Sequence, residues 1–473
     1  MSRLPNSQLS FADLQLQACG VHLDPILQRI ADFLDQNAEI VELVRQDLLR
    51  GVKKPAAGRH GITPAQTLRS LVLMRVKNWD YRDLRDRIND GYTLRNFTQF
   101  DSQAVPKHDA FHRAFLRLTP ATLTAINQAV VRAAVQLDLE DGKQLRVDTT
   151  VVETNIHYPT DGTLLWDAVR TITRQVGDLH QKLPRGVKSF TDRTQSARRR
   201  MQTLQRMTAQ QRQQQQTPKY RELIRITEQV VGEAQKVIAA AKRVHKVDAI
   251  TYAVKEALCQ QIAESCGLAE RIIEQARRRV LQGETVPADE KIYSFFEPHT
   301  DCIKRGKTLK PVEFGHKVFL AESAQGLITD YRVLKGNPVD SDHVQASLDH
   351  HQQIFGCAPD EYAADRGFYT ADNVEQCKTA GVKRVSIPQK GGQKTAEQEQ
   401  LEKSRVFKKG QKFRAGIEGR ISVLFRGRGM KRCLAKGRER FEILVGAAVL
   451  ANNLMRIADL LEKRAAKRRR PAA

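Results

Sequence analysis

The sequence predicts an α/β protein that combines an all-helical N-terminal region, a mixed sheet with covering helices, and a helical insert within the sheet. Three observations predict this fold class. Apolar residues recur at helical spacing up to about residue 135, and strand-like and helix-like segments alternate after about residue 290. Between them, a long polar segment with helical spacing follows a single strand-like stretch. Such an order of elements is typical of a mixed sheet covered by helices.

Residues 1–135 are expected to form helices. Thr63-Pro64 marks a helix start, Asn78-Trp79-Asp80 a tight break, and Tyr81 to Ile88 a second, shorter helix. Helix, break and helix could form a helix-turn-helix DNA reader, and a solvated helical hairpin is the alternative. The basic residues along this segment are Arg69, Arg75, Lys77, Arg82, Arg85 and Arg87.

The first strand is expected over residues 144–152, which are rich in β-branched side chains and follow the turn Asp141-Gly142. The chain then returns to helical spacing from about residue 164 to 282. Within this insert, the glutamine-rich run from Gln210 to Gln216 predicts a solvated connection between long helices. Residues 166–290 hold 23 basic and 14 acidic side chains, an excess compatible with DNA contact.

Strand signals resume with a β-hairpin, Pro311 to Ala321 and Leu327 to Leu334, around a short turn. The later elements are a helix at 342–354, a short strand ending at Asp365, a helix at 371–380, a strand at 382–387, and helices near Glu418 and over 441–462. The expected divisions are a helical region at 1–135, the first part of the sheet domain at 136–163, the insert at 164–290, the remainder of the sheet domain at 291–462 and a basic tail at 463–473.

Charge indicates the partner. Lys and Arg number 78 against 54 acidic residues, and residues 401–473 alone hold 21 basic and 6 acidic side chains. Such an imbalance favours nucleic acid or an anionic membrane surface. The uninterrupted apolar stretch from Ile443 to Ala451 is far shorter than the roughly 20 residues that span a bilayer, so no membrane partner is expected.

The expected compartment is the cytoplasm. Met1 to Pro5 lacks the apolar core of a secretory signal. Seven scattered cysteines without a CxxC pair are expected to be reduced thiols.

Three acidic residues stand where a metal-dependent nucleic-acid enzyme needs them. Asp148 and Asp365 lie in or just after short strand-like stretches, and Glu418 lies in a basic, helix-compatible one. Hard divalent cations prefer oxygen ligands, and two such ions can flank a phosphate that undergoes in-line displacement. The basic chain around these carboxylates fits a polyanionic substrate.

Around these acids the sequence resembles the DDE transposases of bacterial insertion sequences, and it is most similar to the ISNCY family. The resembling stretches are residues 146–161, 364–369 and 413–420, supported by residues 313–317, 336–338 and 446–457. The resemblance spans roughly residues 60–460. It implies a ribonuclease-H-like catalytic domain with an N-terminal helical DNA-binding region.

The resemblance also implies the roles of the three acids. Asp148 corresponds to the first catalytic and metal-ligating acid, on the first strand; Asp365 to the second, at the end of an adjacent strand; and Glu418 to the third, on a late helix. The implied cofactor is a pair of Mg²⁺ ions, with Mn²⁺ as the substitute. The acids are 217 and 53 residues apart, and the helical insert accounts for the longer interval.

Related transposases often carry a tyrosine–arginine–glutamate–lysine signature around the third acid. Arg414 and Glu418 keep the expected separation, but no tyrosine stands at the matching position and Phe425 takes the place of the lysine, with Arg426 beside it. Arg414, Arg420 and Arg426 are candidate DNA contacts because guanidinium can bind phosphate bidentately. Solvated helix charges are the alternative for each of them.

The function implied by the resemblance is DNA transposition: cleavage at the ends of an insertion sequence and strand transfer into target DNA. The partners would be double-stranded DNA, both element ends and target, and a second copy of the chain, since two ends must be brought together. The place of action would be the bacterial cytoplasm, in association with the nucleoid. The alternatives are a catalytically inactive, transposase-derived DNA-binding protein and a ribonuclease-H-fold nuclease without strand transfer.

Overall fold

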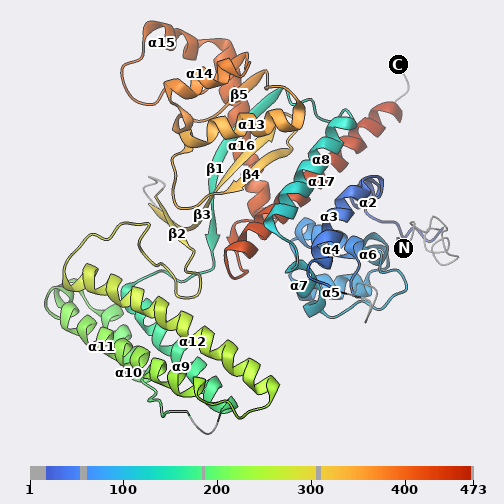
Figure 1. The fold of residues 1–473 in the computed structure, drawn as a ribbon. Helices are drawn as coiled ribbons and strands as arrows, with labels where there is room; N and C mark the ends of the chain where they lie inside the picture. The colour runs from blue at the N-terminus through green and yellow to red at the C-terminus, as the bar shows by residue number, and fades with distance from the viewer. Residues whose placement is uncertain (1–17, 54–60, 184–186, 305–310, 470–473) are drawn as a thin grey trace. The chain divides into compact units, whose positions relative to one another are not determined.

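The computed structural model describes residues 18–53, 61–183, 187–304 and 311–469, and its chain forms two compact units (Figure 1). The first unit contains residues 1–153 and 316–473, and the second contains residues 154–315. The first unit therefore holds the N-terminal helices, most of the sheet and the C-terminal helices, whereas the second unit is a single continuous insertion.

The N-terminal part of the first unit is helical, as the apolar spacing predicts. Its helices are α2 (Pro25–Gln36), α3 (Ala38–Leu49), α4 (Pro64–Lys77), α5 (Tyr81–Asp90), α6 (Tyr92–Thr98), α7 (His108–Phe115) and α8 (Pro120–Gln136). Helix α4 begins with a capping box, in which the Thr63 side chain accepts from the Gln66 amide and the Gln66 side chain accepts from the Thr63 amide. Leu68 and Phe111 belong to one core, which also includes Leu450 of the C-terminal helix α17 (Arg438–Arg469).

The candidate helix-turn-helix segment forms α4 and α5, joined at Asn78, whose φ of 55° ends α4 in the left-handed region. Two of its six basic residues lie inside the fold. Arg69 has a side chain only 4% exposed and pairs with Asp35 at 2.5 Å. Arg75 is half-buried, and burial lowers the pKa of its guanidinium. Both guanidiniums are thus largely withdrawn from solvent, which leaves Lys77, Arg82, Arg85 and Arg87 as candidates for DNA contact.

The sheet is mixed, and seven of its strands lie in the described residues. They are β1 (Gln144–Thr154), β2 (Asp301–Lys304), β3 (Val312–Ser323), β4 (Ile328–Val333), β5 (Glu361–Ala363), β6 (Arg384–Ser386) and β7 (Arg432–Cys433). The order is β2-β3-β1-β5-β6, with β4 also paired to β3 and β7 to β1. Strand β5 runs parallel to both β1 and β6, whereas β4 is antiparallel to β3. The expected α/β class with a helical N-terminal region is confirmed.

Helices cover both faces of the sheet. Helices α13 (Val344–Phe355) and α14 (Ala371–Thr379) pack on one face, where Leu145 and Val147 of β1 share a core with Leu348. Helices α16 (Arg405–Gly427) and α17 pack on the other face, where Val152 shares a core with Ile417. Successive strand residues point to opposite faces, so Arg146 and Asp148 lie on the α16 face of β1. Shorter elements are η2 (Asp340–His343), η3 (Arg366–Phe368) and α15 (Ala396–Lys403).

The second unit is a helical bundle with a core of its own. It contains α9 (Asp161–Lys182), α10 (Thr194–Arg206), α11 (Ala209–Lys242), α12 (Ala249–Ala276) and the π-helical turn η1 (Arg277–Leu281). Its buried apolar cluster runs from Leu164 to Phe295 in the sequence. The two ends of the insertion meet, since the Thr154 hydroxyl lies 3.0 Å from that of Thr300 and 3.5 Å from the Phe314 carbonyl oxygen.

The glutamine run in this bundle was expected to be a solvated connection, and that expectation was wrong. Gln210 to Gln216 form the first turns of α11, which begins with a capping box between Thr208 and Gln211. The side chains of the run are exposed from Gln210 to Gln215. Glutamine has a good intrinsic helix propensity, and the buried residues that follow, from Tyr220 onward, anchor the same helix.

The C-terminal helix α17 is long and apolar enough to cross a membrane by length and composition, but 72% of its most apolar window is buried inside the fold. A mostly buried core helix passes the same test of length and composition. Residues 463–469, expected as part of a basic tail, continue α17, and residues 470–473 lie outside the described residues. All seven cysteines are free thiols.

Candidate active site

Asp148 lies in the middle of β1 on the face covered by α16. Its side chain is 13% exposed and accepts a hydrogen bond from the backbone N–H of Thr149 at 2.7 Å. Burial raises the pKa of Asp148 to about 6, against the opposing effect of Arg414, and the nearby carboxylates of Asp365 and Asp340 raise it further. The desolvation of Asp148 therefore raises its pKa by more than the Arg414 guanidinium lowers it. This single cation does not fully compensate the negative charge of the ionised carboxylate.

Asp365 follows the parallel neighbour of β1. It stands two residues beyond the end of β5, where it caps η3 by accepting from the Gly367 amide at 2.7 Å. Because β1 and β5 are paired in parallel from Gln144 and Glu361 onward, their chains reach the same edge region of the sheet side by side. The first two acids therefore come from adjacent strands.

Glu418 lies on α16, with a side chain 70% exposed. This helix begins at Ser404, whose hydroxyl accepts from the Phe407 amide. Gln411, which stands where related transposases carry a tyrosine, ties α16 to the strand ends: its amide donates to the carbonyl oxygens of Ala364, at 3.1 Å, and Ser386, at 2.6 Å. The residue before Asp365 is thus bonded directly to the helix that carries Glu418.

One guanidinium joins the three acids. The Nη2 atom of Arg414 lies 3.2 Å from a carboxylate oxygen of Asp148 and 3.8 Å from one of Asp365, and its Nη1 atom lies 3.5 Å from Glu418. Acids that are 217 and 53 residues apart in sequence therefore share one cation. The sequence singled out Arg414 as a phosphate contact; in this structure it is the counter-ion of the carboxylates.

A fourth carboxylate, Asp340, also belongs to this cluster and was not identified from the sequence. It accepts a hydrogen bond from the Thr149 hydroxyl at 2.9 Å and pairs with Lys317 at 2.7 Å. A methyl group at Gly367 would come within 3.0 Å of Asp340 and 2.9 Å of Asp365, so this glycine leaves room for two carboxylates. The only sequence signal was an acid shortly after a strand of the sheet, behind the Gly336-Asn337-Pro338 turn.

The donor chemistry suits a hard divalent cation. All three predicted ligands offer carboxylate oxygens, and the raised pKa of Asp148 shows that added positive charge would favour its ionised form. Among the described residues, no three His, Cys, Asp or Glu side chains already surround a common ion position. Residues of the right type are therefore present, and ion binding requires their carboxylates to come closer together than they are around Arg414.

The other two arginines differ in their surroundings. The Arg420 side chain is 19% exposed and donates to Glu322 at 2.8 Å and to Asn452 at 3.1 Å, so a phosphate contact would have to replace these bonds. Arg426 is exposed near the end of α16. Phe425, at the expected lysine position, is partly buried against the core under α16.

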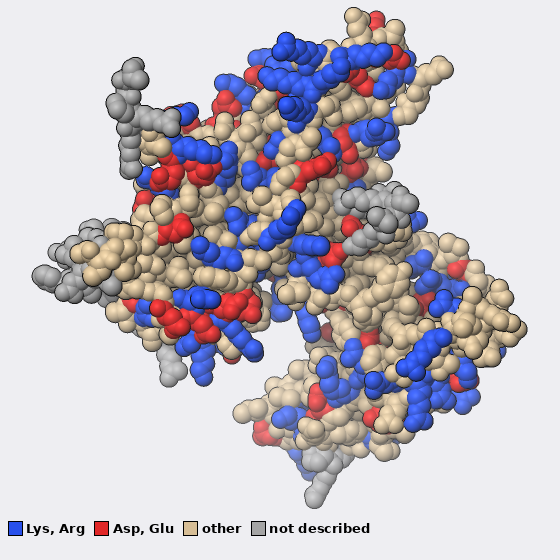
Figure 2. All heavy atoms as spheres, turned by 180° about the vertical axis from the view of Figure 1, so that it is seen from behind, with Lys and Arg blue, Asp and Glu red and all other residues tan. Residues whose placement is uncertain are grey.

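A basic face runs along the N-terminal half of α16, before Glu418 in the sequence. Arg405, Lys408, Lys409 and Lys412 are exposed and follow the spacing that places side chains on one face of a helix. No acidic partner of these four is found in the described part of the chain, whereas Lys403 of the preceding helix α15 pairs with Glu399 at 3.0 Å. Figure 2 shows Lys and Arg gathered at the end of this unit that carries α14 and α15 in Figure 1.

Two family models match this chain. The model described as Transposase DDE domain matches residues 297–454, and the model described as Transposase domain (DUF772) matches residues 21–117. The first range includes Asp365 and Glu418, and Asp148 lies before it. The two matches support a transposase of the insertion-sequence type. The first covers β2 to β7 and the C-terminal helices but not β1, and the second covers the N-terminal helices up to α7. No curated protein and no solved structure matches the chain.

Proposed function

We propose that this protein is a DNA transposase of the DDE type, and that Asp148, Asp365 and Glu418 are its catalytic and metal-ligating residues. The observation that carries the proposal is the convergence of these three carboxylates on the Arg414 guanidinium. The two transposase-domain matches support the same class of enzyme. The acids lie on the first strand, after an adjacent parallel strand and on a late helix, which supports a ribonuclease-H-like catalytic domain, whereas the narrower assignment to the ISNCY family rests on the sequence resemblance alone.

The chemistry follows from the residue types. Two Mg²⁺ ions, or Mn²⁺ in their place, would be held by the three carboxylates and would supply activation of the attacking oxygen and stabilisation of the leaving oxygen. Asp148, 13% exposed, provides a largely desolvated ligand on a strand of the sheet, and Glu418, 70% exposed, is accessible from solvent. Water as the nucleophile gives strand cleavage, and a 3′-hydroxyl gives strand transfer at the same site.

DNA would approach along the basic face of α16. Arg405, Lys408, Lys409 and Lys412 would neutralise backbone phosphates along the N-terminal half of α16, and Arg426, on the same side of the helix, would continue the contact. The N-terminal helices would add contacts to the element ends through the exposed cations of α5. Two ends must be joined in one reaction, so the active form would be a homodimer or a larger assembly on DNA in the bacterial cytoplasm.

The test is a Mg²⁺-dependent nicking assay on a duplex that carries the inverted repeat flanking the coding region. Changing Asp148, Asp365 or Glu418 to Ala should reduce cleavage to background, while binding of the duplex is retained. Asp372→Ala is the matched control, because Asp372 is an exposed acid on α14 close to Asp365 in the sequence. Cleavage by one of the three alanine variants at the wild-type rate would remove that residue from the site.

The same assay separates the alternatives. A catalytically inactive DNA-binding protein would bind the duplex without nicking it under any metal condition. A nuclease of the same fold would nick it but would not join a pre-cleaved 3′ end to a second duplex. Joining of that end, abolished in Asp148→Ala, is the outcome expected of a transposase.

A further inference from the structure

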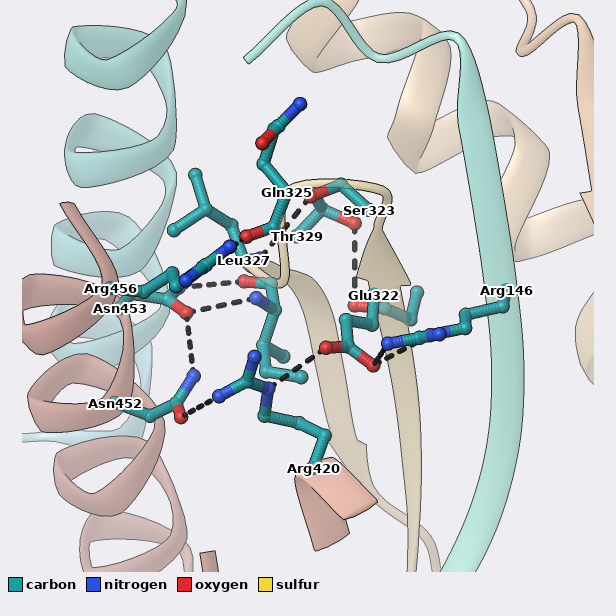
Figure 3. A network of polar contacts seen from close by, with 12 residues as sticks. Arg146, Glu322, Ser323, Gln325, Leu327, Thr329, Arg420, Asn452, Asn453 and Arg456 are labelled. Atoms are coloured by element: carbon teal, nitrogen blue, oxygen red, sulfur yellow. Dashed lines mark hydrogen bonds and ion pairs between the residues drawn. The ribbon is translucent and has the colours of Figure 1, made fainter. Parts of the chain in front are cut away.

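A buried carboxylate connects the elements that carry the first and third acids. Glu322, near the end of β3, has a fully buried side chain that lies between two guanidiniums (Figure 3). One of its oxygens accepts from Nε of Arg146 at 2.8 Å and pairs with Nη2 of the same residue at 2.7 Å. The other oxygen accepts from Nε of Arg420 at 2.8 Å. Both carboxylate oxygens are therefore engaged by charged donors.

Strand alternation accounts for the position of Glu322. Val318 and Leu320 of β3 point into the core under α16, and Glu322 continues this series of alternate residues. Strand β1 is the neighbour of β3 in the sheet, and Arg146 lies on the same face. The carboxylate therefore meets Arg146 across the strands and Arg420 from the helix above them.

Each guanidinium belongs to a residue close to a proposed catalytic acid. Arg146 is two residues before Asp148 on β1, and Arg420 is two residues after Glu418 on α16. Arg146 also reaches α16 itself: its Nη1 donates to the carbonyl oxygen of Phe413 at 2.6 Å, and its guanidinium carbon lies 4.8 Å from the centre of the Phe413 ring.

Gly416 permits this close approach. A Cβ atom at position 416 would overlap Nη1 of Arg146, so any side chain there would displace the arginine. The bonds of Arg420 continue to Asn452 at 3.1 Å, and Asn452 donates to Asn453, which accepts from the backbone of Ile328 on β4 (Figure 3). Helix α16 is thus fixed to β1, β3 and α17 around one carboxylate.

We propose that Glu322 is a positioning residue of the active site: by holding Arg146 and Arg420 together, it sets the spacing between Asp148 and Glu418 that divalent-ion binding requires. This inference rests on the proposed function. Groups that hydrogen-bond directly to metal ligands change metal affinity or activity by about 10- to 100-fold when they are replaced, and Glu322, which acts through Arg146 and Arg420, is expected at the lower end of this range. A carboxylate that only stabilised the fold would change the amount of folded protein and leave the affinity for the ion unchanged.

The test compares Mn²⁺ binding and Mn²⁺-dependent cleavage in wild type and Glu322→Gln, with the protein on its end-containing duplex. Free Mn²⁺ is measured by electron paramagnetic resonance, and the Mn²⁺ concentration for half-maximal cleavage is measured in parallel. Both midpoints should rise about tenfold or more in Glu322→Gln. The matched control is Asp35→Asn, which removes the carboxylate partner of the buried Arg69 in the N-terminal helices; it should lower thermal stability and leave both midpoints unchanged.

A second variant separates positioning from stability. Glu322→Gln combined with Arg420→Met restores the net charge of the cluster, so it should recover thermal stability, but it leaves α16 without its link to β3. The Mn²⁺ midpoints should therefore stay raised in the double variant. Wild-type midpoints in Glu322→Gln, or their full recovery in the double variant, would overturn the positioning role. If wild type binds Mn²⁺ but does not cleave, the proposed function fails, and the Mn²⁺ affinities still decide the role of Glu322.

Discussion

Asp148 combines the features that make a carboxylate a poor contributor to folding and a good metal ligand. Its burial, with Asp365 and Asp340 nearby, outweighs the attraction of Arg414 and raises its pKa from 3.8 to about 6. The native protein therefore holds a proton between these pH values that the unfolded chain has released. A cation bound beside Asp148 would remove this conflict, which links folding, pH and ion binding at one side chain.

In EDTA, the free energy of unfolding of wild type should fall as the pH rises from about 4 to 6, relative to Asp148→Asn. The direction of this change follows from the raised native pKa of Asp148. At low pH the buried carboxyl is protonated and uncharged, whereas above the native pKa it must carry a charge that is less favourable in the native state than in the unfolded chain. The difference should reach at most about 3 kcal/mol at pH 7, from a shift of roughly two pKa units. Urea unfolding at pH 4, 5, 6 and 7 measures it, and Mg²⁺ at pH 7 should stabilise wild type more than the variant. Parallel profiles for the two proteins would contradict this role of Asp148.

Single residues also show what a sequence leaves hidden. Asp148, Asp365 and Glu418 are recognisable because each stands in a distinctive motif. Asp340, Glu322 and Gln411 carry no local signal of this kind, since their importance arises only when β1, β3 and α16 meet. Arg420 illustrates the converse, because a basic residue beside Glu418 suggests a phosphate contact, whereas its guanidinium is bonded to Glu322 and Asn452.

Among the elements, α16 combines the most roles: one side packs on the sheet, Arg414 and Glu418 reach the acid cluster, and a row of cations faces solvent. Two of these cations, Arg405 and Lys408, lie in the first turn of the helix, where positive charge is disfavoured by the helix dipole. Their placement therefore does not help the helix to form. It fits a surface on which DNA phosphates supply the missing negative charge.

Changing Lys408, Lys409 and Lys412 together to Gln should weaken DNA binding in proportion to the number of phosphates that these lysines neutralise. The slope of log K against log salt should decrease in magnitude by about 1 for each such phosphate, hence by up to about 3. Fluorescence anisotropy with a labelled end duplex at several salt concentrations measures this slope. Lys403→Gln is the control, because Lys403 is already paired with Glu399. An unchanged slope in the triple variant would exclude this face of α16 as the DNA surface.

Helices and strands could be predicted where the local sequence pattern favours the same structure that the tertiary packing imposes. The β-branched stretch that forms β1 and the hairpin of β3 and β4 have strong local signals, and the structure contains both. The glutamine run was misassigned because a polar composition was taken to exclude a helix, although α11 needs apolar anchors only beyond Tyr220. The pairing of β1 with β3 and β5 joins segments separated by more than a hundred residues, and no local pattern determines it.

At the scale of the whole molecule, the insertion is self-sufficient in apolar contacts. Its buried cluster draws only on residues of the second unit, between Leu164 and Phe296.

The fragment from Thr154 to Gly315 should therefore fold alone, with a helical far-UV circular dichroism spectrum and a cooperative thermal transition. Val230→Asp, which places a charge at a fully buried position, should abolish the transition, because an unpaired buried carboxylate costs roughly 3 kcal/mol or more. Gln229→Asp, at the exposed neighbouring position, should preserve it. A fragment without a cooperative transition would show that the second unit depends on the first.

The meeting of Thr154 with Thr300 and Phe314 has a consequence for the history of such chains. The polypeptide leaves the sheet and rejoins it at one point. The whole bundle could therefore be gained, lost or exchanged as one contiguous coding segment, without a change in the order or pairing of the strands. Bundles of different length or surface could then be carried at this junction, while the cluster of acids on β1, after β5 and on α16 is inherited intact.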